Sequence, residues 1–94
     1  MNHILNVEIA KKLGINHSIL ITNVFNQYHY KLDDISIKDI VECCIYFSEI
    51  TIRRMLLDLQ HYGLIEREIV KKEFGRSYKY KITDLAQNII RSRG

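Results

Sequence analysis

The residues of this sequence that are best suited to chemistry are Lys and Arg side chains in its last third. Residues 64–94 hold eight Lys and Arg against four Asp and Glu, a net charge of +4, whereas residues 1–63 have a net charge of −1. Fixed positive charge of this kind attracts anionic partners such as the phosphate backbone of a nucleic acid. An ordinary solvent-exposed surface can have the same surplus of positive charge. Whether this charge binds a partner therefore depends on the helices or strands that carry it.

The chain offers little for catalysis or for metal binding. Its only two cysteines, Cys43 and Cys44, are adjacent, and neighbouring cysteines can pair only through a strained ring. The four histidines are scattered without ligand-like spacing, and no CxxC, HExxH or Gly-rich phosphate loop occurs. No nucleophile and base can be paired from this residue set. We therefore predict that the protein is not an enzyme, needs no cofactor or metal, and resides in a reducing compartment.

Length and composition predict one globular domain. The chain has 94 residues, of which 47% are apolar and 27% are charged, a balance typical of a folded domain rather than a disordered segment. No apolar run approaches the roughly 20 residues of a membrane-spanning helix, and the N-terminus lacks the pattern of a secretory signal. We expect a single cytoplasmic domain with no membrane partner.

Hydrophobic periodicity predicts the element order helix, helix, helix, helix, hairpin, helix. The expected helices are one that ends at Gly14, one over 16–32 with Asn16 as its N-cap, one over 36–45, one over 48–62 and one capped by Thr83. Ile35 is expected to form a short bridging strand before the third helix.

The fourth predicted helix has two distinct faces. An apolar stripe at helical spacing should face the core, and it consists of Ile52, Met55, Leu56 and Leu59. Gly63 is the expected residue just past the end of this helix. The opposite face is mostly charged or polar and carries Glu49, Arg53, Asp58 and Gln60, with Arg54 near its edge. That face is free to contact a partner.

Residues 64–83 have the period-two character of two strands joined at the turn "EFGR". A hairpin of this length projects Lys71, Lys72 and Arg76 away from the body of the domain. There they would meet phosphates or a narrow minor groove. The preceding helix, about 10–12 Å in diameter, fits a major groove about 12 Å wide. We therefore predict that the helix and the hairpin are two positively charged elements that contact DNA.

Two short helices joined by a tight turn, the second ending in Gly-Leu-Ile and running into a basic hairpin, resemble the winged helix-turn-helix family of DNA-binding domains. The resemblance covers residues 36–91 and is most specific in "LIEREIVKKEFGRSYKYKITDLA", which is similar to the wing of MarR-type and PadR-type transcriptional regulators. It implies a mainly α fold with a small β-hairpin, formed by residues 1–94 as one domain, with a recognition helix at about 48–62 and a wing at about 64–83.

The resemblance also implies which residues contact DNA. Ser48, Thr51, Arg53 and Arg54 occupy the DNA-facing start of the recognition helix, and Arg76 matches the wing-tip arginine that reaches the minor groove. Glu49 on the same face could accept a hydrogen bond from a cytosine amino group. The complete predicted DNA-binding set is Ser48, Glu49, Thr51, Arg53, Arg54, Lys71, Lys72, Arg76 and Lys79.

The predicted function is that of a sequence-specific regulator of transcription that binds double-stranded DNA, most simply a repressor. We expect a symmetric homodimer, in which the N-terminal segment with Ile4, Leu5 and Val7 packs against the partner's final helix. Leu85 and Ile89 of that helix are expected to close the core of their own protomer.

Three other interpretations of the sequence stay open. The domain could bind a replication origin as an initiator or organiser module of a mobile element. It could also be a winged-helix module for protein interaction, because Leu57 lies on the outer face of the fourth helix near Glu49 and Asp58. Finally, "IAKKLGINHSIL" has the spacing of a simple helix-turn-helix and could be the true reading element.

Overall fold

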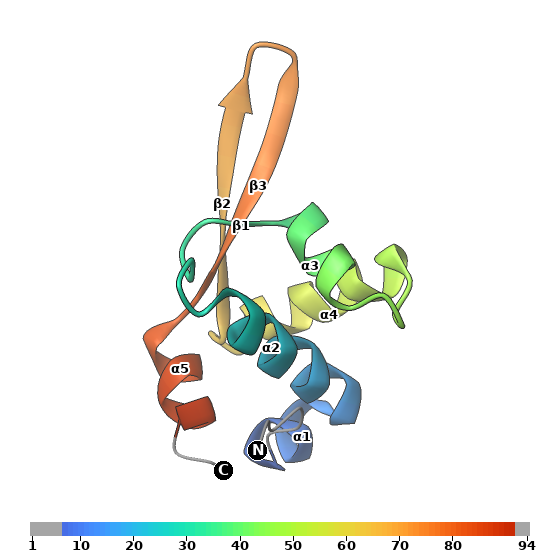
Figure 1. Ribbon diagram of the computed structural model, residues 1–94, viewed down its shortest axis with the longest axis vertical. Helices are drawn as coiled ribbons and strands as arrows, with labels where there is room; N and C mark the ends of the chain where they lie inside the picture. The colour runs from blue at the N-terminus through green and yellow to red at the C-terminus, as the bar shows by residue number, and fades with distance from the viewer. Residues whose placement is uncertain (1–6, 92–94) are drawn as a thin grey trace.

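The computed structural model describes residues 7–91, and its elements follow the predicted order (Figure 1). In chain order they are α1 (Val7–Leu13), α2 (Ile15–Tyr28), β1 (Ile35–Ser36), α3 (Ile37–Cys43), α4 (Glu49–His61), β2 (Ile65–Lys72), β3 (Gly75–Ile82) and α5 (Asp84–Arg91). The helices gather at one end of the molecule, and the hairpin of β2 and β3 projects from them (Figure 1). We call this hairpin the wing.

The three strands form one antiparallel sheet in the order β1-β3-β2. Ile35 lies opposite Tyr80, which confirms the predicted bridging strand. The two long strands pair without interruption from Ile65 opposite Ile82 to Lys72 opposite Gly75. Gly75 has a φ of 96°, a backbone conformation that L side chains rarely adopt, so the wing turns where the sequence offers a glycine.

A single hydrophobic core joins the helices to the base of the sheet. The apolar stripe predicted for α4 is buried: Ile52, Met55, Leu56 and Leu59 are all at most 4% exposed. Their main partners come from the other elements and include Leu20, Ile21 and Val24 of α2, Ile40 of α3, and Tyr80 and Ile82 of β3. Burial of this stripe orients α4 and leaves its opposite face outward.

The start of the second helix differs from the prediction. Asn16 is not its N-cap, because α2 begins one residue earlier, at Ile15, and Gly14 occupies the capping position. Gly14 has a φ of 124°, and its N–H donates to the carbonyl of Ala10 at 2.9 Å. Gly14 therefore ends α1 and also occupies the N-cap position of α2. Because glycine has no side chain, α2 has no side-chain N-cap.

The predicted C-terminal ends of the second and third helices lie too far along the chain. The second helix stops at Tyr28 instead of reaching Leu32, since the Leu32 carbonyl accepts a hydrogen bond from the N–H of Ile82 at 3.0 Å. The third helix ends at Cys43 rather than at residue 45. This hydrogen bond to β3 holds residue 32 beside the sheet. If α2 continued as far as residue 32, this hydrogen bond could not form.

The expectation for Leu85 was also wrong. Leu85 is 53% exposed, whereas its neighbour Ala86 is fully buried and Ile89 is partly buried. The small alanine side chain lets α5 lie close to the core, and this rotates Leu85 toward solvent. Ile4 and Leu5 lie outside the described residues, as does the side chain of Val7.

Candidate nucleic-acid interface

The first turn of α4 is held by its own side chains. Ser48 is the N-cap: its hydroxyl accepts a hydrogen bond from the backbone N–H of Thr51 at 3.2 Å and donates one to the Thr51 hydroxyl at 2.9 Å. Both residues belong to the predicted DNA-binding set. In the free protein their hydroxyls satisfy each other and one backbone donor of the helix end.

Replacing the cap should weaken the domain without touching its core. We expect Ser48→Ala to lower the free energy of unfolding by about 0.5–2 kcal/mol, because the N–H of Thr51 loses its acceptor. Ser48→Asn restores an N-cap acceptor and should recover most of that loss. Urea unfolding followed by circular dichroism measures both variants, and equal stability of Ser48→Ala and the wild type would contradict a capping role.

The two arginines of α4 are in different electrostatic situations. Arg53 donates to Glu49, with Nη2 and Nε at 2.8 and 2.9 Å from Oε2 of that carboxylate. Arg54 is exposed and lies next to the turn between α1 and α2, where it lines a groove with His17 and Thr51. A base or phosphate that contacts Arg53 must therefore compete with Glu49. The carboxylate that lines the groove beside Arg54 is that of Asp58, which is paired with His17.

The other acidic residue of this face is tied to a distant helix. His17 Nε2 lies 2.8 Å from Asp58 Oδ2, so the first turn of α2 is joined to the third turn of α4. This contact links residues 41 positions apart in the sequence. It holds Asp58 at the edge of the outward face of α4.

Strand alternation divides the wing into two faces of different charge. The face that continues the core carries Arg67, Ile69 and Lys71 on β2, opposite Tyr80, Tyr78 and Arg76 on β3. We call it the inner face. Arg67 lies over the ring of Tyr78, with its guanidinium carbon 4.4 Å from the ring centre. Because Ile65 and Ile82 at the base of this face are buried in the core, the inner face lies on the side of the sheet where α4 packs.

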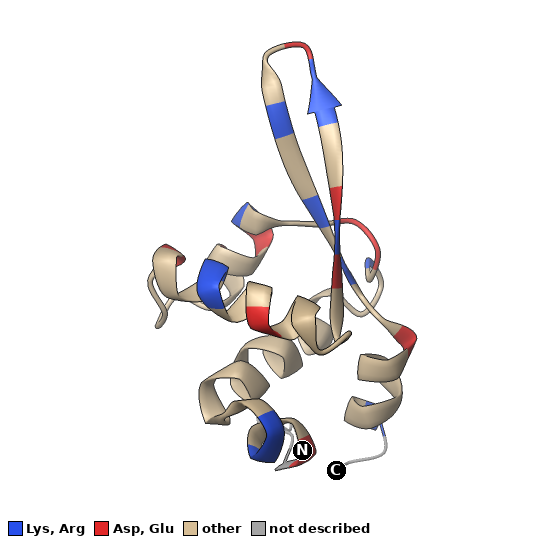
Figure 2. Ribbon diagram, turned by 180° about the vertical axis from the view of Figure 1, so that it is seen from behind, with Lys and Arg blue, Asp and Glu red and all other residues tan. Residues whose placement is uncertain are grey.

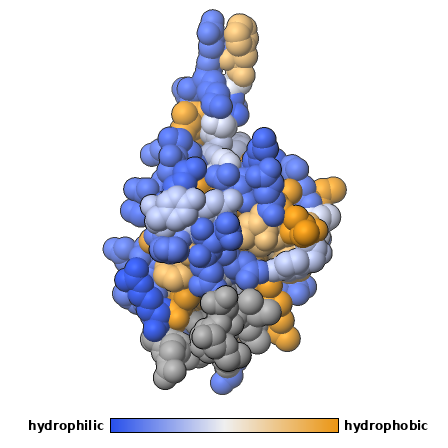
Figure 3. All heavy atoms as spheres, in the orientation of Figure 1, coloured by the Kyte–Doolittle hydropathy of each residue, from blue (hydrophilic) through white to orange (hydrophobic). Residues whose placement is uncertain are grey.

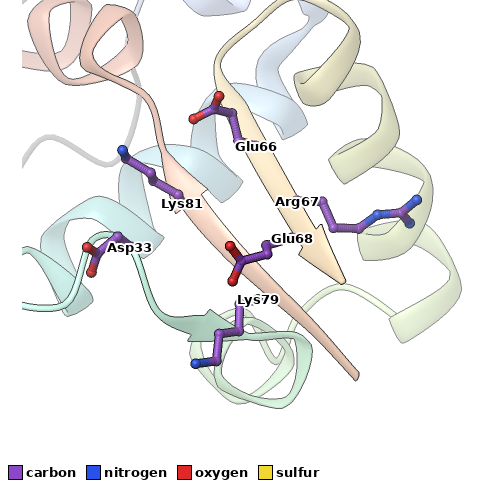
Figure 4. A pocket seen from close by; sticks show the side chains of 6 residues that line it. All are labelled: Asp33, Glu66, Arg67, Glu68, Lys79 and Lys81. Carbon is purple, nitrogen blue, oxygen red and sulfur yellow. The ribbon is translucent and has the colours of Figure 1, made fainter. Parts of the chain in front are cut away.

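The opposite, outer face of the wing is balanced in charge (Figure 4). Glu66 pairs in register with Lys81, and Glu68 pairs with Lys79. The Lys79 ammonium also lies 3.0 Å from the carboxylate of Asp34, and this hydrogen bond raises the pKa of Lys79. Arg67 points away from these four strand residues in Figure 4. The outer face therefore has little net attraction for an anion near its base.

The structure thus brings together some of the predicted residues and separates others. Lys71, Lys72 and Arg76 lie at the tip of the wing, close to its turn. Lys79 lies near the base, on the outer face, in an ion pair. Figure 2 shows basic segments on both strands of the wing and on α4. The start of α4 carries the remaining five predicted residues, Ser48, Glu49, Thr51, Arg53 and Arg54.

Arg67 is a cationic residue of the inner face that the predicted DNA-binding set does not include. It stands two residues before Ile69 and four before Lys71, so period-two alternation alone puts all three on one face. The same alternation separates Lys71 from Lys72. The sequence therefore indicated that Arg67 and Lys71 share a face. It did not indicate which of the two faces of the hairpin continues into the core.

The upstream helix-turn-helix is less suited to contact DNA. Its second helix, α2, packs against α1, α3 and α4. Five of its residues are buried, namely Ser18, Leu20, Ile21, Thr22 and Val24. The exposed residues of α2 lie only at its two ends and are Ile15, Asn16, Asn26 and Gln27, whereas those of α4 recur along its whole length. α4 therefore has a continuous outward face, and α2 has none.

The two cysteines lie in surroundings that disfavour the thiolate. Burial raises the pKa of Cys44 to about 12, and burial also raises the pKa of Cys43. Neutral thiols are poor metal ligands and poor nucleophiles. Across residues 7–91, no three His, Cys, Asp or Glu side chains gather as a metal site requires, and none of the helices there has the length and apolar character needed to cross a bilayer.

Comparison with known proteins identifies the fold. No protein-family model and no curated protein sequence matches the chain. Among solved structures, the chain is similar to a crystal structure of a mutant of MepR from a multidrug-resistant S. aureus clinical isolate, with a TM-score of 0.66 and 16% sequence identity. The match covers 93% of this chain and 60% of the MepR chain, so it spans less than two thirds of the length of that protein. The chain has a winged-helix fold like that of MepR.

Proposed function

We propose that this protein is a sequence-specific regulator of transcription that binds double-stranded DNA in the cytoplasm, most simply as a repressor, and has no catalytic activity. One observation carries the proposal. The outward face of α4 and the cationic inner face of the wing lie on the same side of the sheet, so one duplex can contact both. The helix suits a major groove, and the wing suits the phosphates or minor groove beside it.

Selection from a random duplex pool tests this proposal. The protein is mixed with the pool at near-physiological salt, bound duplexes are recovered, and several rounds are sequenced. We expect a defined motif to emerge, because a helix in the major groove reads base edges. Recovery of duplexes without any shared motif would contradict sequence-specific regulation, and failure to recover duplex at all would contradict DNA binding.

Substitutions in α4 and in the wing should have different effects on this selection. Arg53→Ala or Arg54→Ala should cost about 1–3 kcal/mol at a base-reading position and relax the sequence preference there. Arg76→Ala removes a wing contact and should weaken binding evenly across sequences. The measurement is the dissociation constant of each variant for the selected duplex and for single-base variants of it. An unchanged preference in both α4 variants would exclude α4 as the reading helix.

We further propose that the protein acts as a symmetric homodimer. Specific regulators place two recognition helices about one DNA turn apart, roughly 34 Å, and thereby double a small interface. A mostly apolar hollow between α1, the end of α4 and α5 supports this. Its lining residues are Ile9, Tyr62, Leu64, Leu85 and Ile89, with Glu8 and Lys12 of α1. Light scattering across a concentration series checks it. A one-chain mass at tens of micromolar that a palindromic duplex leaves unchanged would contradict a dimer.

A further inference from the structure

The middle of the outward face of α4 is apolar. Ile50 and Leu57 are 72% and 55% exposed. They are seven residues apart, which is close to two helical turns, so they lie almost in line along the helix. The buried stripe with Ile52 and Leu59 lies on the opposite side of α4. Figure 3 shows the side of the molecule that faces the viewer in Figure 1, where apolar side chains are interspersed with hydrophilic ones on the helical body.

The charged residues beside this pair are held at its two edges. On one edge Arg53 is bound to Glu49, and on the other Asp58 is bound to His17. Arg54 lies between Ile50 and Leu57 along the helix and is exposed. A partner that approaches α4 head-on therefore meets two aliphatic side chains and one guanidinium before it meets the paired charges.

From this geometry, and resting on the DNA-binding function proposed above, we infer that Ile50 and Leu57 read the C5-methyl groups of thymines in the major groove. Thymine is the only base with a methyl group on that edge, and apolar side chains recognise it by contact. The polar edges of the other bases would lose water against Ile50 or Leu57 without gaining a hydrogen bond. The pair would therefore favour thymine over the other bases.

The spacing of the two side chains predicts the spacing of the thymines. Seven residues of α-helix rise about 10.5 Å, and successive base pairs are about 3.4 Å apart. A helix that follows the groove thus sets the two methyl contacts about three base pairs apart. Arg54, between them, would contact the intervening base pairs, where a guanine offers two acceptors to an arginine.

The surroundings favour DNA over an apolar protein surface as the occupant of this face. The side of the domain that bears Ile50 and Leu57 also bears the inner face of the wing, with Arg67, Lys71 and Arg76. A docking site for an apolar partner is expected to be a contiguous patch, whereas here Arg54 separates the two aliphatic residues. The positive charge of Arg54 and of the wing, beside this narrow apolar pair, complements a groove bordered by phosphates.

Replacing thymine by uracil tests the inference, because uracil lacks only the methyl group and keeps every hydrogen-bonding atom. In the selected duplex each thymine is replaced in turn, and dissociation constants are measured. We expect two positions, about three base pairs apart in each half-site, where uracil weakens wild-type binding by about fourfold, as the loss of one buried methyl group predicts. Ile50→Ala should abolish the effect at one position and Leu57→Ala at the other.

Tyr30→Ala is the control, since Tyr30 is 75% exposed and follows the end of α2, outside α4, the wing and the apolar hollow. It should keep both uracil effects. The inference is overturned if the selected motif has no thymines at this spacing, if uracil has no effect anywhere, or if both effects survive in both α4 variants. In each of these cases selective duplex binding still supports the proposed function. Duplex binding that Ile50→Ala and Leu57→Ala leave unchanged would instead point to a protein partner for this face.

Discussion

Raising the salt concentration fourfold, from about 50 to about 200 mM, is expected to weaken duplex binding on the order of 100-fold. The logarithm of the affinity falls with the logarithm of the salt concentration, with a slope of about −0.9 for each phosphate that the protein neutralises. Four cationic residues are exposed on the wing, namely Arg67, Lys71, Lys72 and Arg76. If they engage about four phosphates, the slope is about −3.6, which gives the stated loss. Fluorescence anisotropy with a labelled duplex measures this slope.

Two lysines of the wing provide a matched comparison for the slope. Lys71 lies near the tip on the inner face, whereas Lys79 lies on the outer face in an ion pair with Asp34. Lys71→Ala should reduce the slope by about 1, and Lys79→Ala should reduce it less, because its charge already has a partner. An affinity that stays flat between these salt concentrations would exclude DNA as the partner. Equal slopes in the two variants would show that the pairing with Asp34 does not matter.

Leu56→Ala is expected to lower the free energy of unfolding by about 2–5 kcal/mol, through lost burial and the cavity left behind. Leu56 is 1% exposed and packs in the core between α4 and its neighbours. Domains of this size are stable by only about 5–15 kcal/mol, so this single change removes a large part of the total. Chemical unfolding in urea, followed by circular dichroism, measures the change.

The neighbouring residue supplies the control for this prediction. Leu57→Ala makes the same chemical change on the same helix, but Leu57 is 55% exposed. Its effect on stability should stay within about 0.5 kcal/mol, as for most surface substitutions. The same variant is used in the uracil experiment, so a stable fold there separates lost DNA contacts from lost structure. Equal destabilisation by the two substitutions would mean that the orientation of α4 is wrong.

Much of the fold could be predicted because its signals are local. The bounds of α4 follow from Ser48 as a cap, an apolar stripe at helical spacing and Gly63 just past the end, and the structure confirms them. The wing follows from alternation and from a glycine at its turn. Caps, turns and periodicity involve residues within one or two helical turns of each other, so a sequence displays them directly.

The predictions that were wrong concern residues whose conformation depends on distant contacts. Leu32 fits a helical pattern, but its carbonyl binds the N–H of Ile82, fifty residues away. Leu85 fits an apolar stripe, but the buried Ala86 sets the rotation of α5 and exposes it. Asn16 is a good capping residue, but Gly14 had already started the helix. In each case a tertiary or backbone constraint overrode a reasonable local preference.

By itself the sequence determined that this chain has a helix with a free outward face followed by a basic hairpin, since composition, caps and periodicity specify both elements. Only the tertiary structure decided which charges remain for a partner. Asp58 is engaged by His17 and Lys79 by Asp34, and Arg67 joins Lys71 and Arg76 because the core selects one face of the wing. These contacts join residues far apart in the chain, and a charge becomes paired or free only when folding brings its neighbours to it.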